Sequence, residues 1–267
     1  MSLFRNLLIA KAFDQSKKPL TFTAKEANST VTLNAIGNPT VSGLFYRHGM
    51  NGVWSPYTVG TVLTLDNIGD RIQFWNTETS LSSSQQNYAQ FATTGKLAAS
   101  GNLQSMLNWI DSVPAWGFYR LFYDNKALTT LPEFTAATLG AAAYYSVCEY
   151  CNGLDNVSLI LPAKHIANAG YALAFRYAVG LKEVEIPASQ MDVGYSNLYH
   201  AFADVSTLNK ITVHFTEWKK DWQGNDSFWT NWVANVSSTG TFYKPSALPE
   251  EYGVNRIPEG WTVVNID

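Results

Sequence analysis

The sequence predicts an α+β protein in which an N-terminal antiparallel β-sandwich precedes a short solenoid of about four repeats and a tryptophan-rich C-terminal cap. Two observations predict this class. Short stretches of alternating apolar and polar residues, separated by Gly, Pro and Asn, fill residues 19–98. Three columns of similar residues then recur every 26 or 27 positions between residues 118 and 218. A fixed period in the twenties is the signature of stacked repeats that bury their apolar faces against one another.

The composition is typical of a folded protein and argues against some classes of partner. The chain has 267 residues, enough for two modest domains or for one domain and a repeat array. Its hydrophobic fraction is 46%, so wholesale disorder is not expected. The formal net charge is −3 and the sequence shows no basic patch, so we expect no nucleic-acid partner. No stretch approaches the roughly 20 apolar residues that span a bilayer, so we expect no membrane span.

Residues 1–18 are predicted to form an N-terminal attachment arm. An apolar patch at residues 7–10 follows Arg5 and precedes Lys11. This patch is too short for the core of a signal peptide. Two interpretations stay open: an amphipathic arm that docks on another surface, and a terminus that packs loosely on its own domain.

Residues 19–98 are predicted to form the β-sandwich, an immunoglobulin-like domain. Residues 20–24 alternate between apolar and polar side chains, which is the pattern of a half-buried strand. Strands spaced by roughly ten residues, with turn residues between them, are typical of a small antiparallel sandwich. Further strands are predicted near 31–35, 41–46, 62–65, 72–76 and 91–97.

Residues 99–217 are predicted to form the solenoid with its N-terminal cap. A helical turn over 101–109 would cover the apolar face of the first repeat. Each repeat has an anchor residue, a leucine six residues later and a branched apolar residue after that. The anchors are Phe122, Cys148, Phe175 and Phe202, the leucines are Leu128, Leu154, Leu181 and Leu208, and the branched residues are Leu131, Val157, Val184 and Ile211.

Tyrosines precede the anchors, and the local pattern predicts a helix followed by a strand. Tyr119, Tyr145 and Tyr199 come three residues before an anchor, and Tyr171 comes four before one. A Tyr-x-x-Phe step places two rings on one face of a helical turn, so the anchors are expected in short helices. The leucine then leads into a strand, most clearly over 181–187, where a proline ends the pairing. The three columns and these tyrosines are interpreted as core.

Cys148 and Cys151 form a lone C-x-x-C motif. A zinc site needs two further ligands, and the four histidines show no ligand spacing to this pair or to each other. We therefore expect no metal and no cofactor. Cys148 stands in the anchor column, where a buried cysteine behaves as a small hydrophobic residue. We interpret the pair as structural; a disulfide is compatible with the motif but is not required by it.

The last segment, residues 218–267, is predicted to be the C-terminal cap, with closing strands near 240–242 and 260–264. Tryptophan is favoured both at interfaces and where a ring stacks on a sugar. The tryptophans of this segment can therefore be a lid on the solenoid or a binding surface. As a binding surface, the predicted ligand-binding residues are Trp222, Trp229 and Trp232.

The sequence lacks the motifs of the common enzyme classes, so we expect no enzymatic activity. Glu183 and Glu185 stand two residues apart on one predicted strand face, whereas a glycosidase needs two carboxylates that face each other across the substrate. The chain has no G-x-S-x-G elbow and no glycine-rich phosphate loop.

The repeats resemble the leucine-rich repeats of BspA-like surface proteins. The unit that carries the resemblance runs Ala-Phe-x5-Leu-x2-Val-x-Ile-Pro-Ala over 174–188. Residues 128–139 are similar to the variant common in proteins of gut Bacteroidales and their phages. A Leu-Thr-Phe-Thr-Ala leader and a Gly-Trp-Thr-Val tail extend the resemblance over 19–264. The second unit departs from the pattern because it has Cys148 in place of Phe, and the fourth because it lacks the proline.

The resemblance implies a leucine-rich-repeat solenoid in a non-enzymatic virion or cell-surface protein. A phage virion protein, either a head or tail fibre or a decoration component, would bind other virion proteins through the arm and a host surface glycan or protein through the solenoid. The alternative is an adhesin on the bacterial cell surface, which should carry an export signal; none is visible, so we expect the virion. A third interpretation is a decoration protein without a ligand. We also expect a homo-oligomer.

Overall fold

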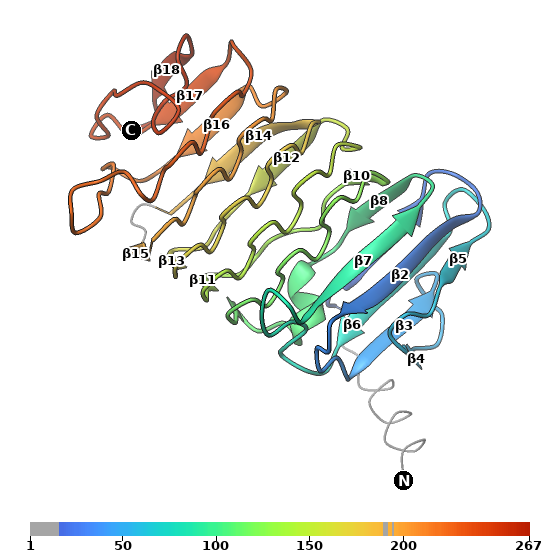
Figure 1. Cartoon of the computed structure of the whole chain (residues 1–267). Coiled ribbons are helices and arrows are strands. Elements are labelled where there is room, and N and C mark those ends of the chain that lie inside the picture. The colour runs from blue at the N-terminus through green and yellow to red at the C-terminus, as the bar shows by residue number, and fades with distance from the viewer. Residues whose placement is uncertain (1–15, 189–191, 194) are drawn as a thin grey trace.

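The computed structural model describes residues 16–188, 192–193 and 195–267 (Figure 1). Antiparallel and mixed sheets form the N-terminal region, and a parallel β-solenoid of about five turns follows. In the described ranges the regular elements are strands and one short 3-10 helix. The predicted order of a β-sheet region and a solenoid is confirmed, but the α+β class is wrong because the expected helices are not formed. Most of the predicted arm, residues 1–15, lies outside the described residues.

The N-terminal strands belong to two sheets. Sheet A has the strand order β10-β8-β1-β6-β3-β4, and sheet B has the order β5-β2-β7. The bounds are β1 (Leu20–Ala24), β2 (Ser29–Ile36), β3 (Leu44–His48), β4 (Ser55–Pro56), β5 (Leu63–Leu65), β6 (Arg71–Asn76), β7 (Tyr88–Thr94), β8 (Leu97–Ser100) and β10 (Leu128–Thr130).

Sheets A and B pack face to face through the apolar residues of their alternating strands. β1 and β6 are antiparallel, with Phe22 opposite Ile72. The rings of Phe22 and Phe74 in sheet A lie 5.0 and 5.3 Å, between centroids, from the ring of Phe91 in sheet B. All these side chains are buried. The predicted period-2 strands therefore bury the faces that the pattern indicates.

The helix η1 (Leu103–Leu107) lies where the sequence predicts a helical turn. The Asn102 side chain accepts a hydrogen bond from the N–H of Gln104 at its start. Asn108 ends the helix in the left-handed region at φ 53, which asparagine tolerates better than most residues. All five residues of η1 are buried. It therefore closes the core next to β6.

The core continues from the N-terminal sheets into the solenoid. β10 runs parallel to β8, with Leu128 opposite Leu97. The first anchor, Phe122, stacks on Phe91 of sheet B with ring centroids 5.7 Å apart. One cluster of buried apolar residues therefore spans both regions. The predicted domain boundary between residues 98 and 99 falls inside β8 and stays a prediction.

Two parallel sheets form two sides of the solenoid. Sheet C has the order β12-β14-β16-β17-β18, and sheet D has the order β15-β13-β11-β9. In sheet C the branched residues Val184 and Ile211 lie opposite each other and are buried, whereas Val157 lies opposite Leu181 because the register shifts between β12 and β14. The bounds are β9 (Ser112–Val113), β11 (Thr138–Leu139), β12 (Val157–Ile160), β13 (His165–Ile166), β14 (Leu181–Ile186), β15 (Asp192–Val193), β16 (Lys210–Val213), β17 (Thr241–Lys244) and β18 (Thr262–Asn265).

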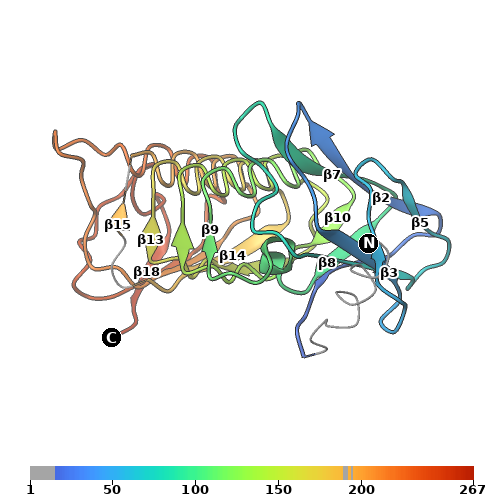
Figure 2. The ribbon, with the colours of Figure 1, turned by 90° about the horizontal axis from the view of Figure 1, so that it is seen from below.

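The third side, which we name the turn face, carries the anchors and is not helical. Every fourth residue has a positive φ, as at Ala142, Ser146 and Tyr150. The N–H of Tyr145 donates to Ala142 within the same turn, while the N–H of Ser146 donates to Ala172 of the next turn. Figure 2 shows this side as a row of coils along one edge of the solenoid. The turn face comprises residues 116–125, 142–151, 169–178, 196–205 and 228–235.

The four-residue period of the turn face decides which side chains enter the core. Anchors and the residues four positions before them point inward, so Tyr171 is only 2% exposed. Of the tyrosines three positions before an anchor, Tyr199 is 37% exposed, Tyr145 is half-buried, and Tyr119 is 5% exposed because it packs on Tyr88 of β7. The prediction that all the tyrosines are core is therefore wrong for Tyr199. The inward pairs are Phe118 and Phe122, Tyr144 and Cys148, Tyr171 and Phe175, Leu198 and Phe202, and Phe228 and Trp232.

The C-terminal segment forms a further turn of the solenoid. Trp232 occupies the anchor position, since the N–H of Phe202 donates to its carbonyl at 2.9 Å and the two rings lie 6.2 Å apart. β17 and β18 pair in parallel with β16 and β17 and extend sheet C. The predicted closing strands are confirmed. The sequence predicts four repeats and a separate cap, whereas the solenoid has about five turns. Among the described residues, no helix has the length and apolar character needed to cross a bilayer.

Candidate functional site

The three tryptophans predicted as ligand-binding residues lie in different environments. Trp222 is 78% exposed, whereas Trp229 and Trp232 are 1% and 0% exposed. The two buried rings contact each other and Trp218. Of the three, Trp222 is therefore the residue whose ring is open to a ligand in this conformation.

Trp222 lies in a tight turn that Asp221 organises. The Asp221 carboxylate accepts hydrogen bonds from the backbone N–H groups of Gln223 and Asn225, at 2.9 and 2.8 Å. The N–H of Asp221 donates back to the Asn225 carbonyl at 2.9 Å. The backbone hydrogen bond from Asn225 stabilises the carboxylate and lowers the pKa of Asp221. The turn thus fixes the backbone of Trp222 while its side chain stays in solvent.

The base of this turn is attached to the buried tryptophan cluster. The indole N–H of Trp229 donates to the carbonyl of Lys219 at 2.8 Å. The indole N–H of Trp218 donates to the carbonyl of Pro249 at 2.9 Å. The first bond joins the chain before Trp222 to the chain after it, and the second fixes the start of this segment to the last turn of the solenoid. A binding residue on a supported turn loses less entropy when it meets its ligand.

The outer surface of sheet C carries polar side-chain pairs between neighbouring strands. Glu183 lies 3.2 Å from the amine of Lys210, and Glu185 lies 3.1 Å from Nε2 of His214. The two glutamates lie side by side on one strand face, as the sequence indicates, and each is paired with the next strand. Because all four side chains are partly exposed, each pair is worth roughly 0–1 kcal/mol.

Glu149 is a buried carboxylate on the turn face. It is 5% exposed, and the Ser146 hydroxyl donates to it at 2.6 Å. Burial raises the pKa of Glu149, although the Ser146 hydrogen bond and the charge of Arg176 partly oppose this. Arg176 lies 3.8 Å from Glu149 and 3.5 Å from Asp204. These charges connect three successive turns of the solenoid.

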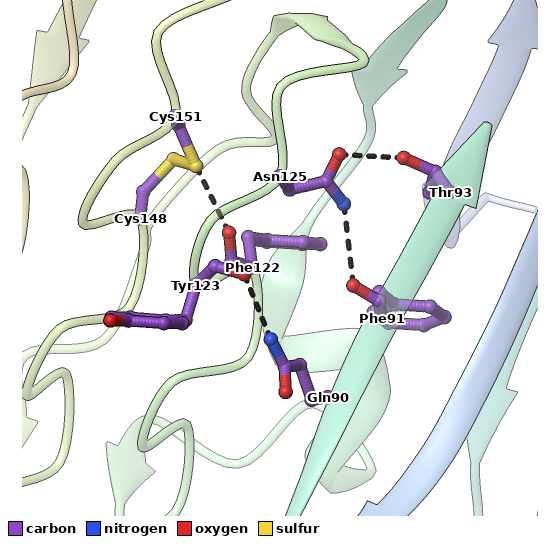
Figure 3. Close-up of a disulfide and its surroundings, with 8 residues drawn as sticks. All are labelled: Gln90, Phe91, Thr93, Phe122, Tyr123, Asn125, Cys148 and Cys151. Carbon is purple, nitrogen blue, oxygen red and sulfur yellow. Dashed lines mark hydrogen bonds between the residues drawn. A yellow bond between two sulfur atoms is a disulfide. The ribbon is translucent and has the colours of Figure 1, made fainter. Parts of the chain in front are cut away.

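Cys148 and Cys151 are joined by a disulfide (Figure 3). Both residues are fully buried, and Sγ of Cys151 lies 3.0 Å from the carbonyl oxygen of Phe122. The disulfide, which the motif allows without requiring it, is thus present in the core. Within the ranges that the structure describes, no group of three or more His, Cys, Asp and Glu side chains could hold a metal ion.

Polar side chains next to the disulfide connect the N-terminal sheets to the first turn of the solenoid (Figure 3). Asn125 accepts a hydrogen bond from the Thr93 hydroxyl at 2.6 Å and donates to the Phe91 carbonyl at 3.3 Å. The Gln90 side chain donates to the carbonyl of Tyr123 at 2.8 Å. These bonds fix the solenoid relative to β7.

Sequence reasoning missed two features of the solenoid. One is Asp221, although the run Asp-Trp-Gln-Gly-Asn contains the residues that form an Asx turn. The other is Tyr144, which is 1% exposed and stacks on Tyr171 with centroids 5.6 Å apart. The signal for Tyr144 is that an aromatic or apolar residue stands four positions before every anchor. A helical interpretation places the third and the fourth position before the anchor on the same face, so it does not single out Tyr144.

Comparisons of this chain with models of known protein families, with curated proteins and with solved structures found no match. What the fold itself establishes is a β-solenoid of about five turns with little helix, joined to N-terminal β-sheets.

Proposed function

We propose that this protein is a non-enzymatic structural component of a phage virion, and that it projects its solenoid and binds a host surface glycan or protein. The virion part of the proposal rests on the resemblance of the repeats to BspA-like proteins. The binding part rests on one observation, the Trp222 ring, which is 78% exposed and stands on an ordered turn. Tryptophan combines a large apolar surface with an N–H donor, and it is enriched at interface hot spots.

The arrangement of the chain supports a projecting role. The segment between β16 and β17, which contains Trp222, lies at the end of the solenoid away from the N-terminal sheets (Figure 1). β1, which follows the arm, belongs to those sheets. Attachment through the arm and recognition by the Trp222 turn would therefore use opposite ends of one continuous core. The proposed attachment segment is residues 1–18.

The binding function is tested by Trp222→Ala in the full chain, with binding to host cells and to a glycan array as the measurement. We expect at least a tenfold loss of binding with an unchanged circular dichroism spectrum, because the ring is exposed and supports no core contact. Tyr252→Ala is a matched control, since Tyr252 is 49% exposed in the same part of the chain. Equal binding by Trp222→Ala and the unaltered protein would contradict the proposal.

The attachment role is tested by deleting residues 1–18 and measuring incorporation into particles. We expect the deletion to abolish incorporation while the rest of the chain stays folded. Incorporation at the unaltered level would assign attachment to another surface. We also propose a homo-oligomer, which sedimentation of the purified chain over a range of concentrations tests.

A second candidate function is an adhesin on the surface of a Bacteroidales bacterium. The Cys148–Cys151 disulfide favours it, because disulfides persist mainly in exported proteins and are rare in the cytosol, where virions assemble. The test is alkylation of the native protein under denaturing conditions without reductant, followed by mass measurement. Two alkylated thiols would favour the virion component, and none would favour the exported adhesin.

A further inference from the structure

The outer face of sheet A holds a second set of buried side chains. On β1 and β6 the residues that alternate with Phe22 and Phe74, including Thr21 and Gln73, point away from sheet B, because Phe22 and Phe74 pack on Phe91 of that sheet. Phe45, Trp54 and Trp75 form a separate buried aromatic cluster in the same sheet region. The outer face of an antiparallel sheet is usually polar and exposed to solvent, whereas this face has buried polar and aromatic side chains.

A cavity of about 670 Å³ lies on this face. Four cationic residues, which are far apart in the sequence, line it together: Lys17, Lys18, Arg47 and Arg71. Glu133 also lines it and lies 3.7 Å from Lys18. The described residues that line the cavity thus have a positive net charge, whereas the whole chain has a formal net charge of −3.

The floor of the cavity is an ordered polar network. The Nε of Arg47 donates to the Gln73 side-chain oxygen at 2.7 Å. The Gln73 amide then donates to the Thr21 hydroxyl at 2.9 Å. These three side chains are between 1% and 7% exposed. The Arg47 guanidinium also lies 4.6 Å above the ring of Trp54, so its orientation is fixed before any ligand arrives.

The rim of the cavity carries exposed charges. Lys17 and Arg71 are exposed, and the Lys17 amine lies 4.6 Å from the Trp109 ring. Guanidinium and ammonium groups recognise carboxylates and sulfates. Thr23, Asn51 and Ser100 add hydroxyl and amide groups to the lining, which suit the hydroxyls of a sugar. The volume lies within the usual range of roughly 300–1,000 Å³ for small-molecule sites.

We propose that this cavity binds an acidic saccharide, with its carboxylate or sulfate on Arg71 and Lys17 and its hydroxyls over the Arg47–Gln73–Thr21 floor. The proposal rests on the proposed function and deepens it, since it names a class of glycan that the protein would bind beside the arm, in addition to the ligand of the Trp222 turn. It is a second site, on sheet A, separate from the Trp222 turn between β16 and β17. Loss of one site therefore leaves the other measurable.

The test is isothermal titration of the full chain with D-glucuronate, with D-glucose as the neutral probe of the same size. We expect glucuronate to bind, glucose to bind at least tenfold more weakly, and the glucuronate affinity to fall as salt is raised. The double variant Lys17→Gln with Arg71→Gln should lose at least tenfold in glucuronate affinity. Both side chains are exposed, so the fold should not depend on them. The matched control is Lys25→Gln with Lys96→Gln, two exposed lysines of the N-terminal region that do not line the cavity.

Three results would overturn this proposal. They are equal binding of glucose and glucuronate, an unchanged affinity in the Lys17 and Arg71 variant, and equally strong competition by inorganic sulfate, which would mark a simple anion site. If glucuronate fails to bind while Trp222→Ala still abolishes cell binding, the acidic-saccharide site falls and the proposed function stands. If Trp222→Ala has no effect while glucuronate binds as expected, the Trp222 part of the proposed function falls and this site stands.

Discussion

At the scale of single residues, position within a turn decides what each aromatic side chain does. Trp222 and Trp232 are ten residues apart, yet one is 78% and the other 0% exposed, because Trp232 takes the anchor position of the fifth turn. The sequence predicts the tryptophan cluster but not this difference. Burial of Trp232 depends on the four-residue period of the turn face and exposure of Trp222 on the turn outside it, and residue types alone reveal neither.

The cationic cavity is a second feature at the residue scale that the sequence does not predict. No basic patch is visible in the sequence, because Lys17, Lys18, Arg47 and Arg71 are spread over more than fifty positions. Strand pairing brings them together: β6 lies between β1 and β3 in sheet A. A charge cluster of this kind follows from sheet order, which local patterns do not specify.

Replacement of Glu149 tests the electrostatics of the turn face. The folded-state pKa of Glu149 is raised above its ordinary value, so the ionised carboxylate costs stability at neutral pH and this cost disappears as the pH falls below the unfolded-state value. Glu149→Gln should therefore raise the free energy of unfolding at pH 7 by about 0.5–1 kcal/mol, and the gain should shrink in acid. Urea denaturation at both pH values measures this. Glu183→Gln on the partly exposed strand face is the control, and a less stable Glu149→Gln protein at pH 7 would refute the explanation.

At the scale of elements, the strands are predictable and the turn face is not. β1, β2 and β6 lie where the alternating pattern predicts strands, β14 lies where the repeat pattern predicts one, and β17 lies at a predicted closing strand. The anchors are not in helices, because in each turn alternate N–H groups donate to the next turn of the solenoid instead of four residues back along the chain. Such bonds require the neighbouring turns to be in place. They are a tertiary effect that a helical spacing of aromatic residues does not reveal.

Glycine substitution tests the unusual backbone of the turn face. Ala142 has φ 52 and Ala141 does not share this left-handed conformation. An alanine to glycine change normally costs about 0.5–1 kcal/mol, but a non-glycine residue in the left-handed region already costs roughly 1–2 kcal/mol. Ala141→Gly should therefore lower the free energy of unfolding by about 1 kcal/mol, whereas Ala142→Gly should leave it unchanged or raise it slightly. Thermal or urea unfolding compares the two, and an equal loss in both variants would contradict the assigned backbone.

At the scale of the whole molecule, the N-terminal sheets and the solenoid share one apolar core. The sequence predicts their order along the chain, and it predicts the repeat period. It does not predict that Phe91 and Phe122 stack across the junction or that Asn125 bonds to β7. These contacts join residues about thirty positions apart, and no local pattern specifies them.

The shared core predicts cooperative unfolding of the described chain. Because one apolar cluster spans both regions, tryptophan fluorescence and far-ultraviolet circular dichroism should report a single, coincident transition in urea. The tryptophans of the last turn and the strands of sheets A and B should lose their signals together. Two separate transitions would show that the predicted boundary near residue 98 divides independent domains.

The most direct test of the proposed function is fractionation of the native protein from an infected culture. Phage particles and bacterial outer membranes are purified from the same culture, and the protein is measured in each by quantitative mass spectrometry. We predict that it sediments with the particles in a constant ratio to the other virion proteins. Its recovery with the outer membrane, and not with the particles, would contradict the virion proposal and establish the surface adhesin in its place.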